Sequence, residues 1–275
     1  MSFKINGVSN CNVMKSELSE GIMITEKDIT ETLKNELQPL PYIYAFWLEG
    51  SFAMGQADEY SDIDYWIDVN DDYVKDALEH VEIALRKLGD LDERDETGND
   101  HPKLGQIVYH IKGSSPYLVL DFNWQLHSRD RKEYHYIKND IVEGALVIFD
   151  KDDVIRFEEA DDLEIIKNKE NCKQECDYRY NQHLRVKKYI DRGTFPESYA
   201  YYNKFVIEPL VIFLRLKYTP LYPYHYLLHI SMHMPRTVVD RLEKLIQVKS
   251  LVEMENRMRE AEEWYHELHE ELYSE

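Results

Sequence analysis

Short apolar runs and longer amphipathic stretches divide the 275-residue chain into two regions of different character. In the first 150 residues, runs rich in aromatic and β-branched side chains predict strands. These runs cover residues 42–48, 65–69, 104–112, 117–126 and 146–150. Two apolar stripes at helical spacing predict helices over 25–38 and 74–88, and Gly89 ends the second. The polar stretch 90–102 predicts a solvated loop.

Beyond residue 150 the pattern becomes helical and glycines become few. Several stretches are predicted to be helical, and in the last of them apolar residues recur at alternating intervals of three and four. These stretches cover residues 162–191, 198–218, 223–233, 236–247 and 251–272. Pro209 lies inside the second stretch and predicts a kink or a break there. The sequence therefore predicts an α+β protein, with a mixed-sheet domain over 1–150 followed by an all-helical domain over 151–275.

The segment between the first two predicted strands, Gly50 to Asp64, holds the densest set of chemically informative residues. Gly50 lets the chain turn sharply, and Ser51 is predicted to cap a short helix whose free N–H groups would attract phosphate. Asp62 and Asp64 are two positions apart, so on a strand their carboxylates point to the same face and can share a cation. Two such carboxylates repel each other unless something neutralises them.

A third acid, Asp121, stands among apolar residues of a later predicted strand. An unpaired buried carboxylate is costly, so Asp121 is expected to have a cation or a hydrogen-bonding partner. A salt bridge to Arg129 or Arg131 is one way to satisfy it.

The segment from Gly50 to Asp64 resembles the signature of the DNA polymerase beta-like nucleotidyltransferase superfamily, in which Gly-Ser, a short helix and Asp-x-Asp on the next strand follow one another. The residues that match are Gly50, Ser51, Gly55, Ser61, Asp62 and Asp64. The resemblance implies that the protein is an enzyme that moves a nucleoside monophosphate from a triphosphate, first of all ATP, to a hydroxyl group. It also implies one or two Mg²⁺ ions, because carboxylates and phosphate oxygens are the ligands that Mg²⁺ prefers.

The resemblance assigns roles to individual residues. The catalytic and metal-binding residues are Asp62, Asp64 and Asp121. The nucleotide-binding residues are Gly50, Ser51, Ser61, Lys204 and Arg192. The last two come from the helical domain, because many members carry a basic residue near the second glycine where this chain has Ala53 and Met54. If Asp121 is salt-bridged instead, Asp68 or the acids of the 90–102 stretch would complete the metal site.

The layout of a transferase domain followed by helices resembles the antibiotic nucleotidyltransferases, especially the aminoglycoside- and lincosamide-modifying kinds. This resemblance implies that the acceptor is a hydroxyl group of a small molecule and that the helical domain recognises this molecule. Several of the 21 tyrosines could stack on a base or a sugar. They are Tyr199, Tyr201, Tyr202, Tyr222, Tyr224 and Tyr226. Two other interpretations remain open: a protein-modifying, antitoxin-like adenylyltransferase and a catalytically silent nucleotide-binding protein.

Charge and composition limit the classes of molecule that the protein is expected to bind. With 53 acidic and 33 basic residues the net charge is −20, which disfavours nucleic acid as a partner. Long uncharged apolar runs are lacking, so we expect no membrane partner and a cytoplasmic protein. Cys11, Cys172 and Cys176 are too few for a disulfide framework and are predicted to be reduced thiols. The apolar stripe of the last helix predicts core packing and leaves a homodimer open.

The histidines at 225, 229 and 233 stand at helical spacing. This spacing predicts a common helix face more strongly than a metal cluster.

Overall fold

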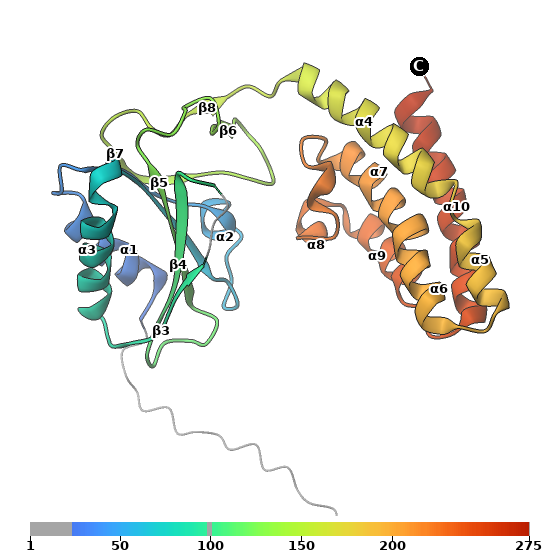
Figure 1. Cartoon of the computed structure of the whole chain (residues 1–275), viewed down its shortest axis with the longest axis horizontal. Coiled ribbons are helices and arrows are strands. Elements are labelled where there is room, and N and C mark those ends of the chain that lie inside the picture. Colours follow the sequence, from blue (N-terminus) through green and yellow to red (C-terminus); the bar gives the residue numbers. More distant parts are fainter. Residues whose placement is uncertain (1–23, 98–100, 275) are drawn as a thin grey trace, which may run out of the picture. The chain divides into compact units, whose positions relative to one another are not determined.

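The computed structural model describes residues 24–97 and 101–274 (Figure 1). These residues form two compact units. The first contains the described residues up to Trp47 together with Ala57–Arg129, and the second contains Leu48–Gln56 together with the residues from Asp130 onward. The predicted domain boundary after residue 150 stays a prediction. Cys11 lies outside the described residues, whereas Cys172 and Cys176 are buried free thiols.

A six-stranded mixed sheet has the order β3-β4-β5-β2-β1-β7. Its strands are β1 (Ile43–Leu48), β2 (Ile63–Val69), β3 (Leu91–Thr97), β4 (Leu104–Ile111), β5 (Val119–Leu126) and β7 (Leu146–Asp150). Strand β2 pairs with β5 in parallel, whereas β4 is antiparallel to both β3 and β5. With the helices that follow, the sheet confirms the predicted α+β class.

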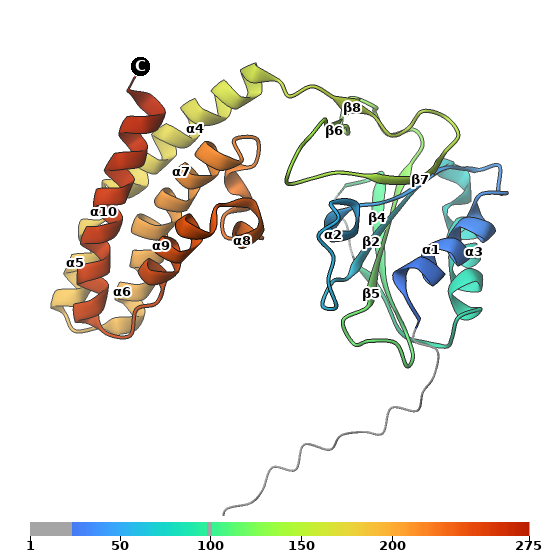
Figure 2. The ribbon, with the colours of Figure 1, turned by 180° about the vertical axis from the view of Figure 1, so that it is seen from behind.

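Helices α1 (Glu26–Leu37) and α3 (Val74–Arg86) pack together on one side of the sheet (Figures 1 and 2). Thr25 begins α1 as its N-cap, and a capping box with Asp28 satisfies free N–H groups of the first turn. The hydroxyl of Tyr65 on β2 lies 2.6 Å from Thr30 Oγ1 on α1. Because side chains alternate along a strand, the neighbours of Tyr65, including Asp64, project from the opposite face of the sheet.

The prediction of a loop over 90–102 was wrong for most of that stretch. Residues Leu91–Thr97 form β3, which pairs with β4 at the end of the sheet. Most of its residues are charged and exposed. It therefore lacks the alternation of apolar and polar residues from which a strand is predicted. Pairing of its backbone with β4 overrides the local preference, and residues 98–100 lie outside the described part.

The second unit is built mainly from helices around its own apolar core. The helices with more than one full turn are α4 (Asp162–Tyr180), α5 (Leu184–Asp191), α6 (Phe195–Tyr202), α7 (Glu208–Tyr218), α9 (Arg236–Ile246) and α10 (Leu251–Tyr273). Shorter elements include β6 (Tyr136–Ile137), β8 (Phe157–Glu158), the 3₁₀ turn Pro223–His225 and α8 (Ile230–His233). Helix α7 packs against both α4 and α10. The apolar stripe of α10 is buried in this core, as the predicted core packing requires. The possible homodimer stays a prediction.

Pro209 coincides with a change of helix geometry and not with a break. The π-helical segment Asn203–Ile207 joins α6 to α7 without interruption, and Pro209 is the second residue of α7. Within the described residues, no helix is long and apolar enough to span a membrane.

The prediction of one helix over 223–233 was wrong. The chain instead makes a 3₁₀ turn and then the four-residue helix α8, with Tyr226 at φ +50° and His229 at φ +51° between them. A left-handed backbone conformation at two non-glycine residues interrupts any continuous helix. His225, His229 and His233 therefore do not share a helix face.

Candidate active site

The first unit brings two of the predicted acids to neighbouring positions. Asp64 on β2 and Asp121 on β5 are register partners in a parallel pair, and adjacent strands lie about 4.8 Å apart. Both side chains therefore start from the same face of the sheet, opposite α1 and α3. Asp62 immediately precedes β2, and its negative charge reaches Asp121.

Asp121 is half-buried and hydrogen-bonded but has no cationic partner among the described side chains. Its Oδ1 accepts a hydrogen bond from Gln106 Nε2 on β4. Burial raises the pKa of the Asp121 carboxyl above its usual value, and the charge of Asp62 raises that pKa further. The alternative salt bridges do not form, since Arg129 donates to Gln125 and Arg131 pairs with Asp152.

Asp68 has structural partners of its own. Its carboxylate is buried, accepts a 2.7 Å hydrogen bond from Gln125 Nε2, and lies 2.6 Å from His127 Nδ1. A carboxylate held in this way is satisfied by the protein. The alternative that Asp68 completes the metal site is therefore less favoured by the contacts than Asp121.

The donor chemistry at Asp62, Asp64 and Asp121 fits a divalent cation. All three side chains offer hard oxygen ligands, and Asp121 has no basic side chain beside it among the described residues. Burial raises the pKa of Asp121, and the charge of Asp62 adds to this shift. No group of three or more His, Cys, Asp or Glu within residues 24–97 and 101–274 is arranged closely enough to hold a metal ion. Metal binding by these acids stays a prediction.

The turn between β1 and β2 differs in detail from the expectation. Gly50 adopts φ +58° and Gly55 φ +66°, conformations that glycine adopts without strain, on either side of the short helix α2 (Gly50–Ala53). Ser51 is not the cap, because the N-cap position belongs to Glu49. Ser51 Oγ is instead buried and has no hydrogen-bond partner among the described residues. An unsatisfied hydroxyl of this kind is costly and is suited to donate to a ligand oxygen.

The hydroxyl of Ser61 is engaged locally. It donates to Asp58 Oδ1 at 3.2 Å and accepts from the Asp58 backbone N–H at 2.9 Å. These contacts fix the turn that delivers Asp62 to the start of β2. A role of Ser61 in nucleotide binding stays a prediction.

Lys204 and Arg192 lie in the second unit on one aromatic cluster. The rings of Tyr189, Tyr201 and Phe205 stack in sequence, with centroids 4.9 and 5.5 Å apart. Arg192 lies 5.3 Å from the ring of Tyr189, and Lys204 lies 5.8 Å from that of Phe205. Both cations are exposed, and neither forms an ion pair within the described part of the chain. Their assignment to the nucleotide phosphates stays a prediction.

A group that the sequence did not reveal surrounds Glu49, the residue before the signature glycine. Tyr134 and Tyr136 both donate hydrogen bonds to Glu49 Oε1, the second at 2.5 Å. Partial burial raises the pKa of Glu143, and the charges of Glu49 and Asp140 add to this shift. The cluster thus gathers three carboxylates and two phenols from segments about ninety positions apart. In the sequence, the only local sign of this cluster was the acid directly before Gly50.

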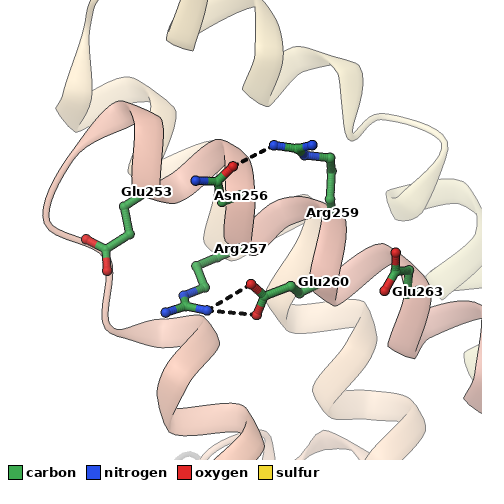
Figure 3. Close-up of a pocket in the computed structure, with 6 residues that line it drawn as sticks. All are labelled: Glu253, Asn256, Arg257, Arg259, Glu260 and Glu263. Atoms are coloured by element: carbon green, nitrogen blue, oxygen red, sulfur yellow. Dashed lines mark hydrogen bonds and ion pairs between the residues drawn. The ribbon is translucent and has the colours of Figure 1, made fainter.

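A hollow on α10 is unrelated to these predicted residues (Figure 3). Its lining comes from α10 alone: Glu253, Asn256, Arg257, Arg259, Glu260 and Glu263. Arg257 Nη1 contacts both carboxylate oxygens of Glu260, at 2.9 and 2.8 Å, and Arg259 donates to Asn256. These groups pair mainly with one another, so the hollow is best explained as a charged helix surface.

The sequence matches the family described as nucleotidyltransferase domain over residues 30–193, which is more than half of the chain. The protein belongs to this family, and the superfamily inferred from Gly50 to Asp64 is confirmed. Among solved structures, the chain is similar to an aminoglycoside 6-adenyltransferase from Bacillus subtilis, with 13% identity, 91% of each chain covered and a TM-score of 0.37. It is also similar to JHP933 from Helicobacter pylori, with 14% identity, 91% of this chain and 95% of that chain covered, and a TM-score of 0.26. A search of curated proteins found no match.

Proposed function

We propose that the protein transfers a nucleoside monophosphate, with ATP as the first donor to test, to a hydroxyl group of a small molecule. The observation that carries this proposal is the pairing of Asp64 with Asp121 on adjacent parallel strands, with Asp62 two residues before Asp64. Asp121 accepts a hydrogen bond from Gln106 but has no basic partner among the described side chains, whereas Asp68 is held by Gln125 and His127. Membership of the nucleotidyltransferase-domain family supports the same reaction.

Four of the predicted residues and their neighbour Gln106 would have distinct tasks in this reaction. Asp62, Asp64 and Asp121 would hold Mg²⁺, which when bound neutralises phosphate charge and aligns the triphosphate. Gln106, by donating to Asp121 Oδ1, fixes the orientation of that carboxylate. Ser51 Oγ, which lacks a protein partner within the described residues, would donate to a phosphate oxygen.

The Glu49 cluster supports a cationic acceptor. Burial and the charges of Glu49 and Asp140 raise the pKa of Glu143. The nearby phenol hydroxyls already donate to Glu49 and Asp140, so their oxygens would accept hydrogen bonds from hydroxyl or ammonium groups of a ligand. A ligand with several ammonium groups would relieve the mutual repulsion of these carboxylates. We therefore rank aminoglycosides first and lincosamides second among the acceptors to test.

The test has two stages. Thermal shifts with ATP, CTP, GTP and UTP, each with Mg²⁺ and with chelator, detect nucleotide binding, since a ligand at a hundred times its Kd stabilises by about 2.7 kcal/mol. Mass detection of a nucleotide adduct after incubation with aminoglycosides and lincosamides then detects transfer. An adduct on the acceptor supports the proposal, an adduct on protein would favour a protein-modifying enzyme, and binding without any adduct would favour a silent nucleotide-binding protein.

A further inference from the structure

Arg215 is a buried cation without a carboxylate partner. Its side chain on α7 is fully shielded from solvent, and it forms no ion pair with any described residue. Arginine is almost never fully buried unless paired, because removing a charge from water costs several kcal/mol. Such a residue has to be held by other contacts, and those contacts show what it does.

The Arg215 guanidinium holds the segment Thr219–Met234, which we call the α7–α9 loop. Its Nε donates to the backbone oxygen of Tyr226 at 2.9 Å, and its Nη2 donates to the backbone oxygen of Leu228. Its Nη1 lies 2.9 Å from His233 Nδ1, so a neutral His233 accepts this hydrogen bond. Burial lowers the pKa of His233 to about 4, with the charge of Arg215 as the next cause, which keeps His233 neutral near pH 7.

The α7–α9 loop is strained and exposes apolar side chains. Tyr226 and His229 both have positive φ, an arrangement that costs of order 1–3 kcal/mol per residue and persists only where the surroundings impose it. Tyr224 and Leu228 are each 59% exposed, and Met232 is 45% exposed. Strain maintained by a buried charge, beneath exposed apolar groups, is typical of a surface shaped to contact a ligand.

The loop also reaches the carboxylates that surround Glu49. The Tyr222 hydroxyl donates a hydrogen bond to Asp140 Oδ2, and His225 Nε2 lies 3.9 Å from Glu143 Oε1. These two contacts join the loop to the acidic cluster within the second unit. The orientation of Asp140 and Glu143 therefore depends on where the loop is held.

From these contacts we propose that Arg215 and His233 are positioning residues, which lock the α7–α9 loop so that Tyr222 and His225 orient Asp140 and Glu143 for a cationic acceptor. The proposal rests on the proposed function for the nature of the ligand. The locking of the loop itself rests on the contacts of Arg215 alone. Neither residue is assigned to touch the reacting atoms.

Two substitutions of His233 distinguish loss of the lock on the α7–α9 loop from destabilisation of the whole second unit. His233→Leu removes the acceptor and leaves an Arg215 N–H buried without a partner, whereas His233→Asn offers a side-chain oxygen in place of Nδ1. His266→Leu on exposed α10 surface is the matched control. Hydrogen exchange of amides 219–233 should be about tenfold faster in His233→Leu, and near the parent rate in His233→Asn and His266→Leu. Unchanged exchange in His233→Leu, or an equal increase throughout α7 and α10, would overturn the proposal.

The second readout is the Michaelis constant for the acceptor identified by adduct mass. His233→Leu should raise KM for the acceptor about tenfold, while KM for the nucleotide and kcat stay within about twofold, and His233→Asn should restore the parent value. An unchanged acceptor KM despite faster loop exchange would refute the link to the acceptor. If the parent protein modifies no acceptor, the proposed function and the acceptor role fail together, and the exchange rates still decide whether Arg215 and His233 lock the loop.

Discussion

Asp121→Asn should separate catalysis from stability. The amide keeps the size of the side chain and retains an oxygen that can accept the hydrogen bond from Gln106 Nε2. It removes one negative charge from a position that faces Asp64 across the strand pair and feels the charge of Asp62. The substitution therefore removes a metal ligand while preserving the shape of the site.

The sizes of the two effects follow from the strand geometry. Two carboxylates about 5 Å apart repel by roughly 1 kcal/mol in water and by about 3 kcal/mol at an effective dielectric constant of 20. Without metal, the amide should thus raise the free energy of unfolding by about 1 kcal/mol and the Tm by about 2–4 °C. Loss of about 4 kcal/mol of metal-mediated charge stabilisation would slow transfer about a thousandfold.

The assay compares Asp121→Asn with Glu79→Gln, which removes the same charge from the exposed surface of α3. Chemical unfolding in metal-free buffer gives the stability, and the rate of adduct formation with Mg²⁺ gives the activity. Glu79→Gln should leave both near the parent values. A marked loss of stability in Asp121→Asn, or transfer within a few-fold of the parent rate, would show that Asp121 is a structural acid.

Three further predictions concern residues whose contacts the structure defines. Asp68→Asn should lower the free energy of unfolding by about 1–3 kcal/mol in urea titrations and leave transfer within a few-fold, because it disturbs the buried bonds to Gln125 and His127. Ser51→Ala should leave the metal-free protein as stable or up to about 1 kcal/mol more stable, yet weaken nucleotide binding about tenfold in thermal-shift titrations. Because the pKa of His233 is near 4 in the fold and about 6.5 unfolded, the unfolded chain binds more protons between these values, so stability should fall as pH falls from about 6.5 to 4. Urea titrations across this range should show a flatter pH dependence in His233→Asn.

Local patterns were sufficient for most of the regular elements. The capping box at Thr25 marks the start of α1, and the apolar stripe from Val74 gives α3 to within two residues. The isolated acid Asp121 was recognisable because a carboxylate among apolar neighbours demands a partner. In these cases the physical cause lies within a few residues of the effect.

Other features arise from contacts between distant segments, so no local pattern announces them. Strand β3 forms because β4 offers an unpaired edge to a charged segment. The α7–α9 loop replaces a helix because Arg215, earlier in the chain, binds the backbone oxygens of Tyr226 and Leu228. The phenols at Glu49 come from a segment about ninety positions later. Sequence spacing alone cannot reveal such contacts.

We propose that Asp62, Asp64 and Asp121 carry a metal-dependent nucleotidyl transfer. The most direct test of this proposal is the rate of nucleotide-adduct formation on the acceptor, measured by mass for the parent protein and for Asp64→Asn, each with Mg²⁺ and with chelator. We predict transfer by the parent protein with Mg²⁺ only, and a rate about a thousandfold lower for Asp64→Asn. Full transfer in chelator, or parent-like transfer by Asp64→Asn, would contradict the account.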